Sequence, residues 1–210
     1  MLIAIDGLSN TGKTKCAKEL AKILGINVFN TGNVYRAIIL KMISENVKKN
    51  NKKEIKRVLS NINITLKNNK IYLDNIDVTK KIKTQEVSEK TMIYSDIKEI
   101  KEYVRNIQNA FIKNSKDLVM EGRDIAERIM PNADFKFYLY SDSDTKALRL
   151  SKKRTTMSYK DVKKEIESRD QYDITTGNFV KPTDSIEINV SDKTIDEVVQ
   201  IMLENIKNVK

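Results

Sequence analysis

The sequence has 210 residues, with 39 Lys or Arg, 29 Asp or Glu and no His, so its formal net charge is +10. Its length suits one domain with a small inserted subdomain, and its apolar runs are too short to cross a membrane. One cysteine and no histidine exclude an internal disulfide, a His-ligated zinc site and histidine acid–base chemistry. Because an apolar segment follows Met1 directly, we expect no signal peptide and a cytoplasmic location.

The first predicted elements are a strand, a glycine-containing loop and a helix. Residues 2–5 form an apolar run typical of a buried strand, and residues 7–14 fit the pattern G-x-x-x-x-G-K-[ST]. Backbone N–H groups of such a loop, with the following helix N-terminus, bind phosphate. Lys13 would reach the β- and γ-phosphates and the Thr14 hydroxyl would ligate Mg²⁺. The expected nucleotide-binding residues are Gly7, Leu8, Ser9, Asn10, Thr11, Gly12, Lys13, Thr14 and Lys15.

The middle of the chain combines helical patterns with a β-rich segment. Apolar spacing predicts helices at about 32–46, 53–59, 84–95 and 97–114. Alternating residues predict a hairpin with a turn at 67–70, followed by a short strand at 76–79. The Asn/Lys-rich run 47–53 is typical of a solvated surface, and no RNP-like or zinc-finger pattern accompanies it, so we do not expect a nucleic-acid partner.

The last third of the chain alternates strands with helices. The strands are predicted at 118–120, 135–140 and 186–190, and the helices at 143–153, 158–170 and 195–206. This alternation predicts an α/β fold with a central parallel sheet covered by helices. Within one domain over 1–210, we expect a small β-rich insert at about 60–95 and a short lid at about 150–168.

Spaced arginines are the second candidate feature of a site. Arg123 follows a predicted strand end, where open α/β sheets place their ligands. The planar guanidinium binds phosphate oxygens in pairs, so it suits a reaction between two phosphates. For each arginine a surface ion pair is the structural alternative, and this alternative is strongest for Arg149 and Arg154, which neighbour other basic residues.

Five segments, in order along the chain, resemble the bacterial cytidylate kinases, which transfer a phosphoryl group from ATP to CMP or dCMP. They are Ile5-Asp6-Gly7 with the loop, Asn30-Thr31-Gly32-Asn33-Val34-Tyr35-Arg36, the stretch 73–87, Glu121-Gly122-Arg123-Asp124 and Glu167-Ser168-Arg169-Asp170 with Asp173. The resemblance implies a P-loop kinase fold whose insert binds the nucleoside monophosphate. It also implies ATP and Mg²⁺ as cofactors, CMP or dCMP as small-molecule substrate, and a role in pyrimidine metabolism.

Site residues follow from the resemblance by position. It implies catalytic roles for Lys13, Arg36, Arg123 and Arg169. It implies substrate contacts for Thr31, Arg36, Lys101, Arg123, Asp124, Arg169 and Asp173.

Three positions depart from the family pattern where the family holds the pyrimidine or its phosphate. Met92 replaces a serine, Lys101 replaces an arginine and Thr176 aligns with another arginine. Lys cannot make the paired contact of Arg, and Met cannot hydrogen-bond a base. Two alternatives therefore remain open: a kinase for a different nucleoside monophosphate, and a non-catalytic basic protein that binds nucleotide or RNA. We expect a monomer that does not bind membranes.

Overall fold

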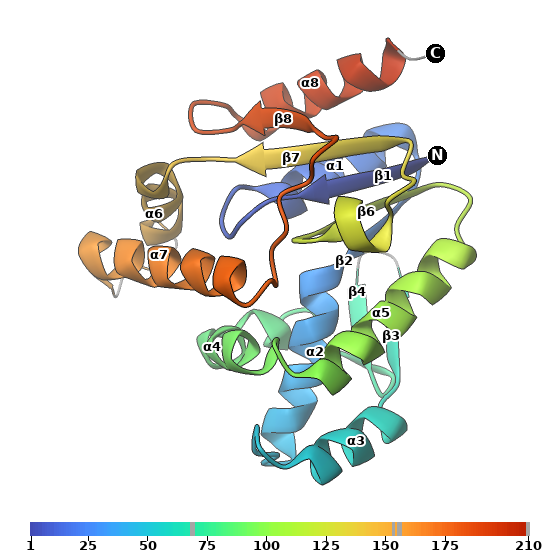
Figure 1. Cartoon of the computed structure of the whole chain (residues 1–210), viewed down its shortest axis with the longest axis vertical. Helices are drawn as coiled ribbons and strands as arrows, with labels where there is room; N and C mark the ends of the chain where they lie inside the picture. Colours follow the sequence, from blue (N-terminus) through green and yellow to red (C-terminus); the bar gives the residue numbers. More distant parts are fainter. Residues whose placement is uncertain (68–69, 153, 155–156, 209–210) are drawn as a thin grey trace. The chain divides into compact units, whose positions relative to one another are not determined.

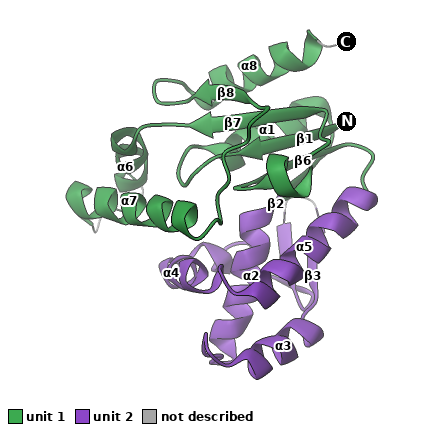
Figure 2. Cartoon of the chain, in the orientation of Figure 1, with its two compact units in different colours: residues 1–29, 115–210 green, residues 30–114 purple. Residues whose placement is uncertain are grey.

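The chain divides into two compact units. The computed structural model describes residues 1–67, 70–152, 154 and 157–208, and Figure 1 labels the helices and strands. Unit 1 comprises Met1–Phe29 and Ser115–Lys210, and unit 2 comprises Asn30–Asn114 (Figure 2). Unit 2 contains the predicted insert of about 60–95 and the helices before and after it. That this insert binds a nucleoside monophosphate stays a prediction.

Unit 1 is built on a five-stranded sheet with the order β2-β6-β1-β7-β8. Strand β1 runs parallel to both β6 and β7, and β7 runs parallel to β8. The loops after these parallel strands therefore leave from the same edge of the sheet, where α/β folds bind ligands. The predicted central parallel sheet is confirmed. The strands are β1 (Leu2–Asp6), β2 (Asn27–Asn30), β6 (Leu118–Gly122), β7 (Phe135–Tyr140) and β8 (Ile186–Asn189).

Helices cover the sheet of unit 1 and extend from its edge. Helices α1 (Lys13–Leu24) and α8 (Ile195–Lys207) bury apolar side chains against β1 and β7, as with Leu20 and Met202 around Phe137. A capping box at Thr194 and Glu197 satisfies the backbone at the start of α8. Helices α6 (Ser143–Ser151) and α7 (Tyr159–Thr175) pack against each other (Figure 1).

Unit 2 is organised around one apolar helix, α2 (Thr31–Ser44), which packs against β4, α4 and α5. Its Ile38, Ile39 and Met42 are fully buried. The three-stranded antiparallel sheet confirms the predicted hairpin strands, whereas turn residues 68–69 lie outside the described residues. The remaining elements are α3 (Lys52–Asn61), β3 (Ile64–Lys67), β4 (Lys70–Leu73), β5 (Ile76–Asp77), the 3-10 turn η1 (Lys81–Lys83), α4 (Gln85–Tyr94) and α5 (Lys98–Lys113).

Several boundaries differ from the sequence predictions. Strand β2 was not predicted, because its four residues have exposed or partly exposed polar ends and no apolar alternation. The charged helix predicted at 158–170 continues to Thr175, where Gly177 at φ 65° follows its end. Residues 153, 155 and 156 of the expected lid lie outside the described part, and the described lid residues include the end of α6 and the start of α7.

A π-helical segment, η2 (Ile125–Ile129), follows β6 and was also not predicted. The buried Asp6 carboxylate at the end of β1 accepts the backbone N–H groups of Ile125 at 2.9 Å and Ala126 at 2.7 Å. This contact spans 119 residues of sequence, so no local pattern could indicate it. Among the helices that the structure describes, none has both the length and the apolar character to cross a bilayer.

Candidate active site

The glycine loop joins β1 to α1 at the carboxyl edge of the sheet. Asn10 at φ 57° and Gly12 at φ 93° let the backbone curl before the first turn of α1. A Cβ atom on Gly7 would lie 2.3 Å from the backbone oxygen of Leu139, at the end of β7. The loop therefore passes so close to β7 that only glycine fits at this position.

Lys13 is folded back into this loop. Its Nζ donates to the Leu8 carbonyl oxygen at 2.6 Å and lies 3.4 Å from Thr11 Oγ1. The side chain is buried, and burial lowers the pKa of Lys13 to about 8, mainly through desolvation of the ammonium. A buried cation inside a curl of backbone amides is arranged to receive an anion.

Thr14 and Glu121 supply oxygen atoms beside the loop. The Thr14 hydroxyl donates to Glu121 Oε1 at 2.7 Å, and Glu121 is a buried residue of β6. A hydroxyl and a carboxylate are ligands of the type that Mg²⁺ prefers, in a site that phosphate oxygens and water complete. These residues therefore fit the expected ion. The described residues hold no cluster of three His, Cys, Asp or Glu that could bind a metal without such help.

The other predicted nucleotide-binding residues lie in the same segment. Ser9 and Thr11 are buried, Leu8, Asn10 and Gly12 are not exposed, and Lys15 is exposed on the first turn of α1. The Lys15 and Cys16 N–H groups both donate to the Gly12 carbonyl oxygen, which fixes the start of the helix.

Two predicted substrate residues of unit 1 are in contact: Arg123, which follows β6, and Asp173, in the last turns of α7. Arg123 Nε lies 2.6 Å from Asp173 Oδ2, a close ion contact that lacks hydrogen-bond geometry. Backbone bonds join both residues to the segment after α7: Phe179 N donates to the Asp173 carbonyl oxygen and Val180 N to that of Arg123. Arg169 lies one turn before Asp173 on α7 and is partly exposed.

Asp124 follows Arg123 and directly precedes the π-helical segment. Its carboxylate lies 3.7 Å from Arg128 NH1, and the same guanidinium nitrogen donates to the Gly177 carbonyl oxygen at 2.7 Å. Arg128 therefore links Asp124 to the segment that directly follows α7.

The predicted substrate residues of unit 2 lie on α2 and α5. Gln108 Nε2 on α5 donates to the buried Thr31 Oγ1 at 3.0 Å. Arg36 NH1 donates to the Ile82 carbonyl oxygen at 3.1 Å and to Ser88 Oγ at 2.9 Å. Lys101 is partly buried on α5. The structure joins Thr31 and Arg36 to side chains that the sequence did not single out, while the substrate roles themselves stay predictions.

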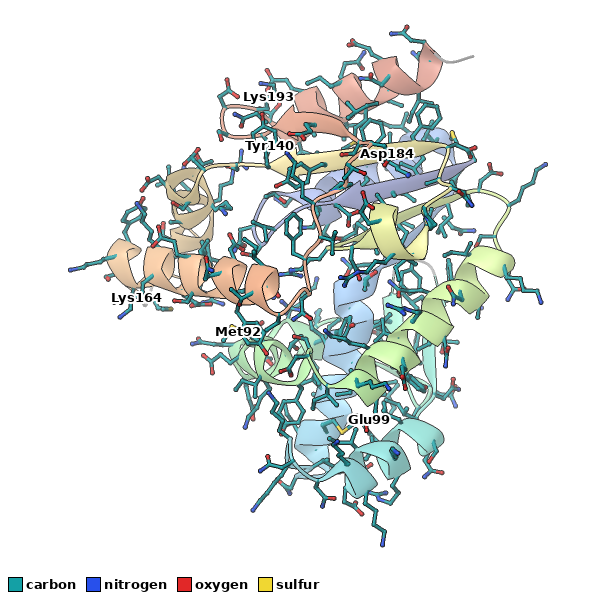
Figure 3. All side chains as sticks on the ribbon, in the orientation of Figure 1. Met92, Glu99, Tyr140, Lys164, Asp184 and Lys193 are labelled. Atoms are coloured by element: carbon teal, nitrogen blue, oxygen red, sulfur yellow. The ribbon has the colours of Figure 1, made fainter. Side chains whose placement is uncertain are left out.

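Two of the departing positions, Met92 and Thr176, have a hydroxyl group at or beside them: that of Thr91, which precedes Met92, and that of Thr176 itself. Thr91 Oγ1 donates to the Val87 carbonyl oxygen at 2.6 Å, and Thr176 Oγ1 to that of Tyr172 at 2.6 Å. Met92 lies on α4 with its side chain partly buried (Figure 3). The nearest hydroxyl to the replaced serine is thus bonded to its own helix.

Arg149 and Arg154, at the start of the expected lid, bind protein groups. Arg149 donates to the carbonyl oxygens of Val190, Ser191 and Lys193, in the loop after β8. Arg154 NH1 lies 2.5 Å from Glu165 Oε2 on α7. Arg154 therefore forms an ion pair, as the structural alternative predicted. Arg149 instead donates hydrogen bonds to backbone carbonyl groups of a loop.

One buried network beside the loop was missed by the sequence reasoning. Asp170 Oδ1 accepts Ser9 Oγ at 2.6 Å and Ser9 N at 3.2 Å, and Lys146 Nζ lies 2.5 Å from Asp170 Oδ2. Ser9 and Asp170 are 161 residues apart, so only the fold brings them together.

Sequence comparison identifies relatives along nearly the whole chain. A family profile described as "Cytidylate kinase" matches residues 3–208. The cytidylate kinase of Caldanaerobacter subterraneus subsp. tengcongensis is 37% identical, over 99% of this chain and 96% of the relative. That of Clostridioides difficile is 34% identical, over 98% of both chains.

Comparison with solved structures supports the fold alone. A shikimate kinase from Bacteroides thetaiotaomicron matches with a TM-score of 0.52 and 11% identity, over 99% of this chain and 98% of that structure. An uncharacterized protein from Eubacterium ventriosum matches with a TM-score of 0.54, 15% identity and the same coverage.

Proposed function

The chain belongs to the cytidylate kinase family, and on that premise we propose that it transfers the γ-phosphoryl group of ATP to CMP or dCMP. The observation that carries this proposal is the buried Lys13 ammonium inside a loop of backbone amides. We place the reaction in pyrimidine nucleotide metabolism in the cytoplasm, with a monomeric enzyme and no macromolecular partner.

On the donor side, the loop residues 7–15 bind the triphosphate. Its oxygens replace the Leu8 carbonyl oxygen as partner of the Lys13 ammonium, and the α1 N-terminus adds its positive dipole end. Thr14 and Glu121 would hold Mg²⁺, which neutralises phosphate charge when bound. Lys13 then follows the γ-phosphoryl group as charge spreads over its oxygens.

On the acceptor side, guanidinium groups neutralise the incoming monophosphate. In unit 1 we assign Arg123 and Arg169 to its phosphate and Asp173 to its ribose, with Asp124 available to the cytosine amino group. In unit 2 we assign Thr31, Arg36 and Lys101 to the acceptor from the family resemblance. Arg123 already lies 2.6 Å from an anionic group, so it can exchange one negative partner for another.

The transfer is in line and needs no covalent enzyme intermediate. The attacking group is a phosphate oxygen that is already ionised, so no strong general base is required. Catalysis then consists of positioning two nucleotides and stabilising charge at the transferring group.

An acceptor panel tests this proposal. The purified chain is assayed for ADP release from MgATP with CMP, dCMP, UMP, AMP and GMP, each at several concentrations. We expect kcat/KM for CMP or dCMP to exceed that for AMP and GMP by at least about a hundredfold. Preference for another acceptor, or salt-sensitive RNA binding without acceptor-dependent ADP release, would replace the proposal with one of the two alternatives.

A further inference from the structure

A buried ion pair links two helices to the phosphate loop. Lys146 on α6 and Asp170 on α7 lie 2.5 Å apart, with side chains only 7% and 9% exposed. Both carboxylate oxygens of Asp170 are engaged, one by the Lys146 ammonium and the other by Ser9. A buried carboxylate needs such partners, since an unpaired buried charge is strongly unfavourable.

Asp170 holds the phosphate loop through the backbone and the side chain of Ser9. Ser9 N and Ser9 Oγ both donate to Asp170 Oδ1, at 3.2 and 2.6 Å. Ser9 lies in the segment whose amides form the phosphate-binding curl, so its orientation affects the direction of those amides. A negative acceptor makes these hydrogen bonds stronger than a neutral one would.

We propose that Lys146 is a positioning residue for ATP: by pairing with Asp170 it fixes the orientation of this carboxylate, and Asp170 holds Ser9 and hence the phosphate loop. This inference deepens the proposed kinase function and rests on it only in naming ATP as the ligand. Lys146 acts through Asp170 and does not itself contact the nucleotide.

The same two helices carry a second Lys–Asp pair that provides a matched control. Lys163 Nζ on α7 lies 2.7 Å from Asp144 Oδ1 on α6, but these side chains are 33% and 64% exposed, whereas Ser9 donates to Asp170. Removing either lysine removes one contact between α6 and α7. Only the removal of Lys146 alters the partner of Ser9.

The experiment measures the Kd of MgATP by titration calorimetry, without acceptor, well below the unfolding temperature of each variant. We expect Lys146→Met and Asp170→Asn each to raise Kd about tenfold, the effect of weakening one charged hydrogen-bond partner. Lys163→Met should leave Kd unchanged. In steady-state assays of Lys146→Met, the KM for ATP should rise about as much as Kd, while the KM for CMP and kcat change less than about threefold.

The double variant Lys146→Met/Asp170→Asn separates an indirect role from a direct contact. If Lys146 acts through Asp170, adding Lys146→Met to Asp170→Asn should change Kd less than about twofold. A tenfold change in both backgrounds would mean that Lys146 contacts the nucleotide, and would overturn the proposal. Because the double variant buries no unpaired charge, its comparison with wild type still decides the question if a single variant does not fold: a rise in Kd of about tenfold fits action through Asp170, and a rise of about a hundredfold means an independent contact.

A purely structural role would also be recognised. In that case Lys146→Met and Asp170→Asn would lower the unfolding temperature and leave the Kd of MgATP unchanged, which would contradict the inference. If the wild-type chain phosphorylates none of the pyrimidine acceptors while these two variants still weaken MgATP binding, the proposed function fails and the inference stands.

Discussion

Lys13 is the residue whose protonation the proposed reaction depends on most. Burial lowers its pKa to about 8 from 10.5, so in the free protein it loses its proton at a lower pH than in the unfolded chain. Between these two values the unfolded chain binds more protons, and this group therefore contributes stability that increases with pH. Binding has the opposite dependence, because the phosphates of ATP favour the charged ammonium.

The affinity for MgATP should therefore fall as the pH rises above about 8. For wild type we expect Kd to rise toward about tenfold per pH unit, as proton uptake becomes linked to binding. The variant Lys13→Arg should bind with little pH dependence, since guanidinium stays charged throughout this range. Titration calorimetry between pH 7 and 10 measures both, and parallel curves for the two proteins would contradict the assignment.

Gly7 and Gly25 allow the effects of two glycine-to-alanine substitutions to be compared. Gly25 has φ 68° with no atom near a Cβ position, so Gly25→Ala should cost about 1–2 kcal/mol from the left-handed backbone alone. Gly7→Ala places a methyl group against the Leu139 backbone oxygen and should cost more, by about 1–3 kcal/mol of overpacking.

Of these two substitutions, only Gly7→Ala should affect nucleotide binding. Urea unfolding gives the two stabilities, and the Kd of MgATP should rise for Gly7→Ala and remain unchanged for Gly25→Ala. Equal stability losses with normal binding in both variants would show that the close approach of the loop to β7 has no functional consequence.

Among the elements, β1 and the π-helical segment after β6 are joined by one carboxylate. Burial raises the pKa of Asp6 to about 6 from 3.8, against the lowering effect of two backbone hydrogen bonds. The folded protein then holds the proton more tightly than the unfolded chain. The contribution of Asp6 to the free energy of unfolding should therefore fall as pH rises from about 4 to 6.

The variant Asp6→Asn isolates this contribution of Asp6. Between pH 4 and pH 6, the free energy of unfolding of this variant should rise relative to that of wild type by about 2 kcal/mol, the part of the pKa shift that falls within this range. At every pH it also lacks one acceptor for an N–H group of the segment after β6. Urea unfolding at pH 4, 5, 6 and 7 measures the difference. A constant difference over this range would show that Asp6 titrates normally.

The sequence allowed prediction of elements whose signals are local. The phosphate loop has a fixed spacing of glycines and lysine, and the hairpin of unit 2 has alternating apolar residues on either side of its turn. By contrast, β2 becomes a strand because a neighbouring strand completes its hydrogen bonds, and η2 is fixed by Asp6 from 119 residues away. Neither contact leaves a periodic pattern in its own segment.

The residues of the candidate site also divide into those that a local sequence pattern indicates and those that only the fold brings together. Lys13 and Thr14 could be placed from the loop pattern alone, and Arg123 from its position after a strand. Lys146 and Gln108 could not be identified as partners of site residues, because each lies on a helix whose other residues show no functional spacing. The structure shows that these charged or amide side chains are buried, and a buried polar side chain on an amphipathic helix indicates a specific hydrogen-bond partner.

For the whole molecule, the positive charge is consistent with two polyanionic substrates. The chain carries 39 basic and 29 acidic residues, and many acidic groups described here are already paired with lysine or arginine. The remaining positive charge attracts nucleotides over distances of about a Debye length. Family membership over residues 3–208 includes both compact units, so the whole chain is the unit to assay.

The decisive measurement is the stoichiometry of products from MgATP and CMP, with ADP and CDP quantified together by chromatography. The wild-type chain should form one CDP for each ADP, and Lys13→Ala should lower that rate by at least about a hundredfold while remaining folded. ADP formation without CDP, or an unchanged rate in Lys13→Ala, would contradict phosphoryl transfer from this loop to a cytidine nucleotide.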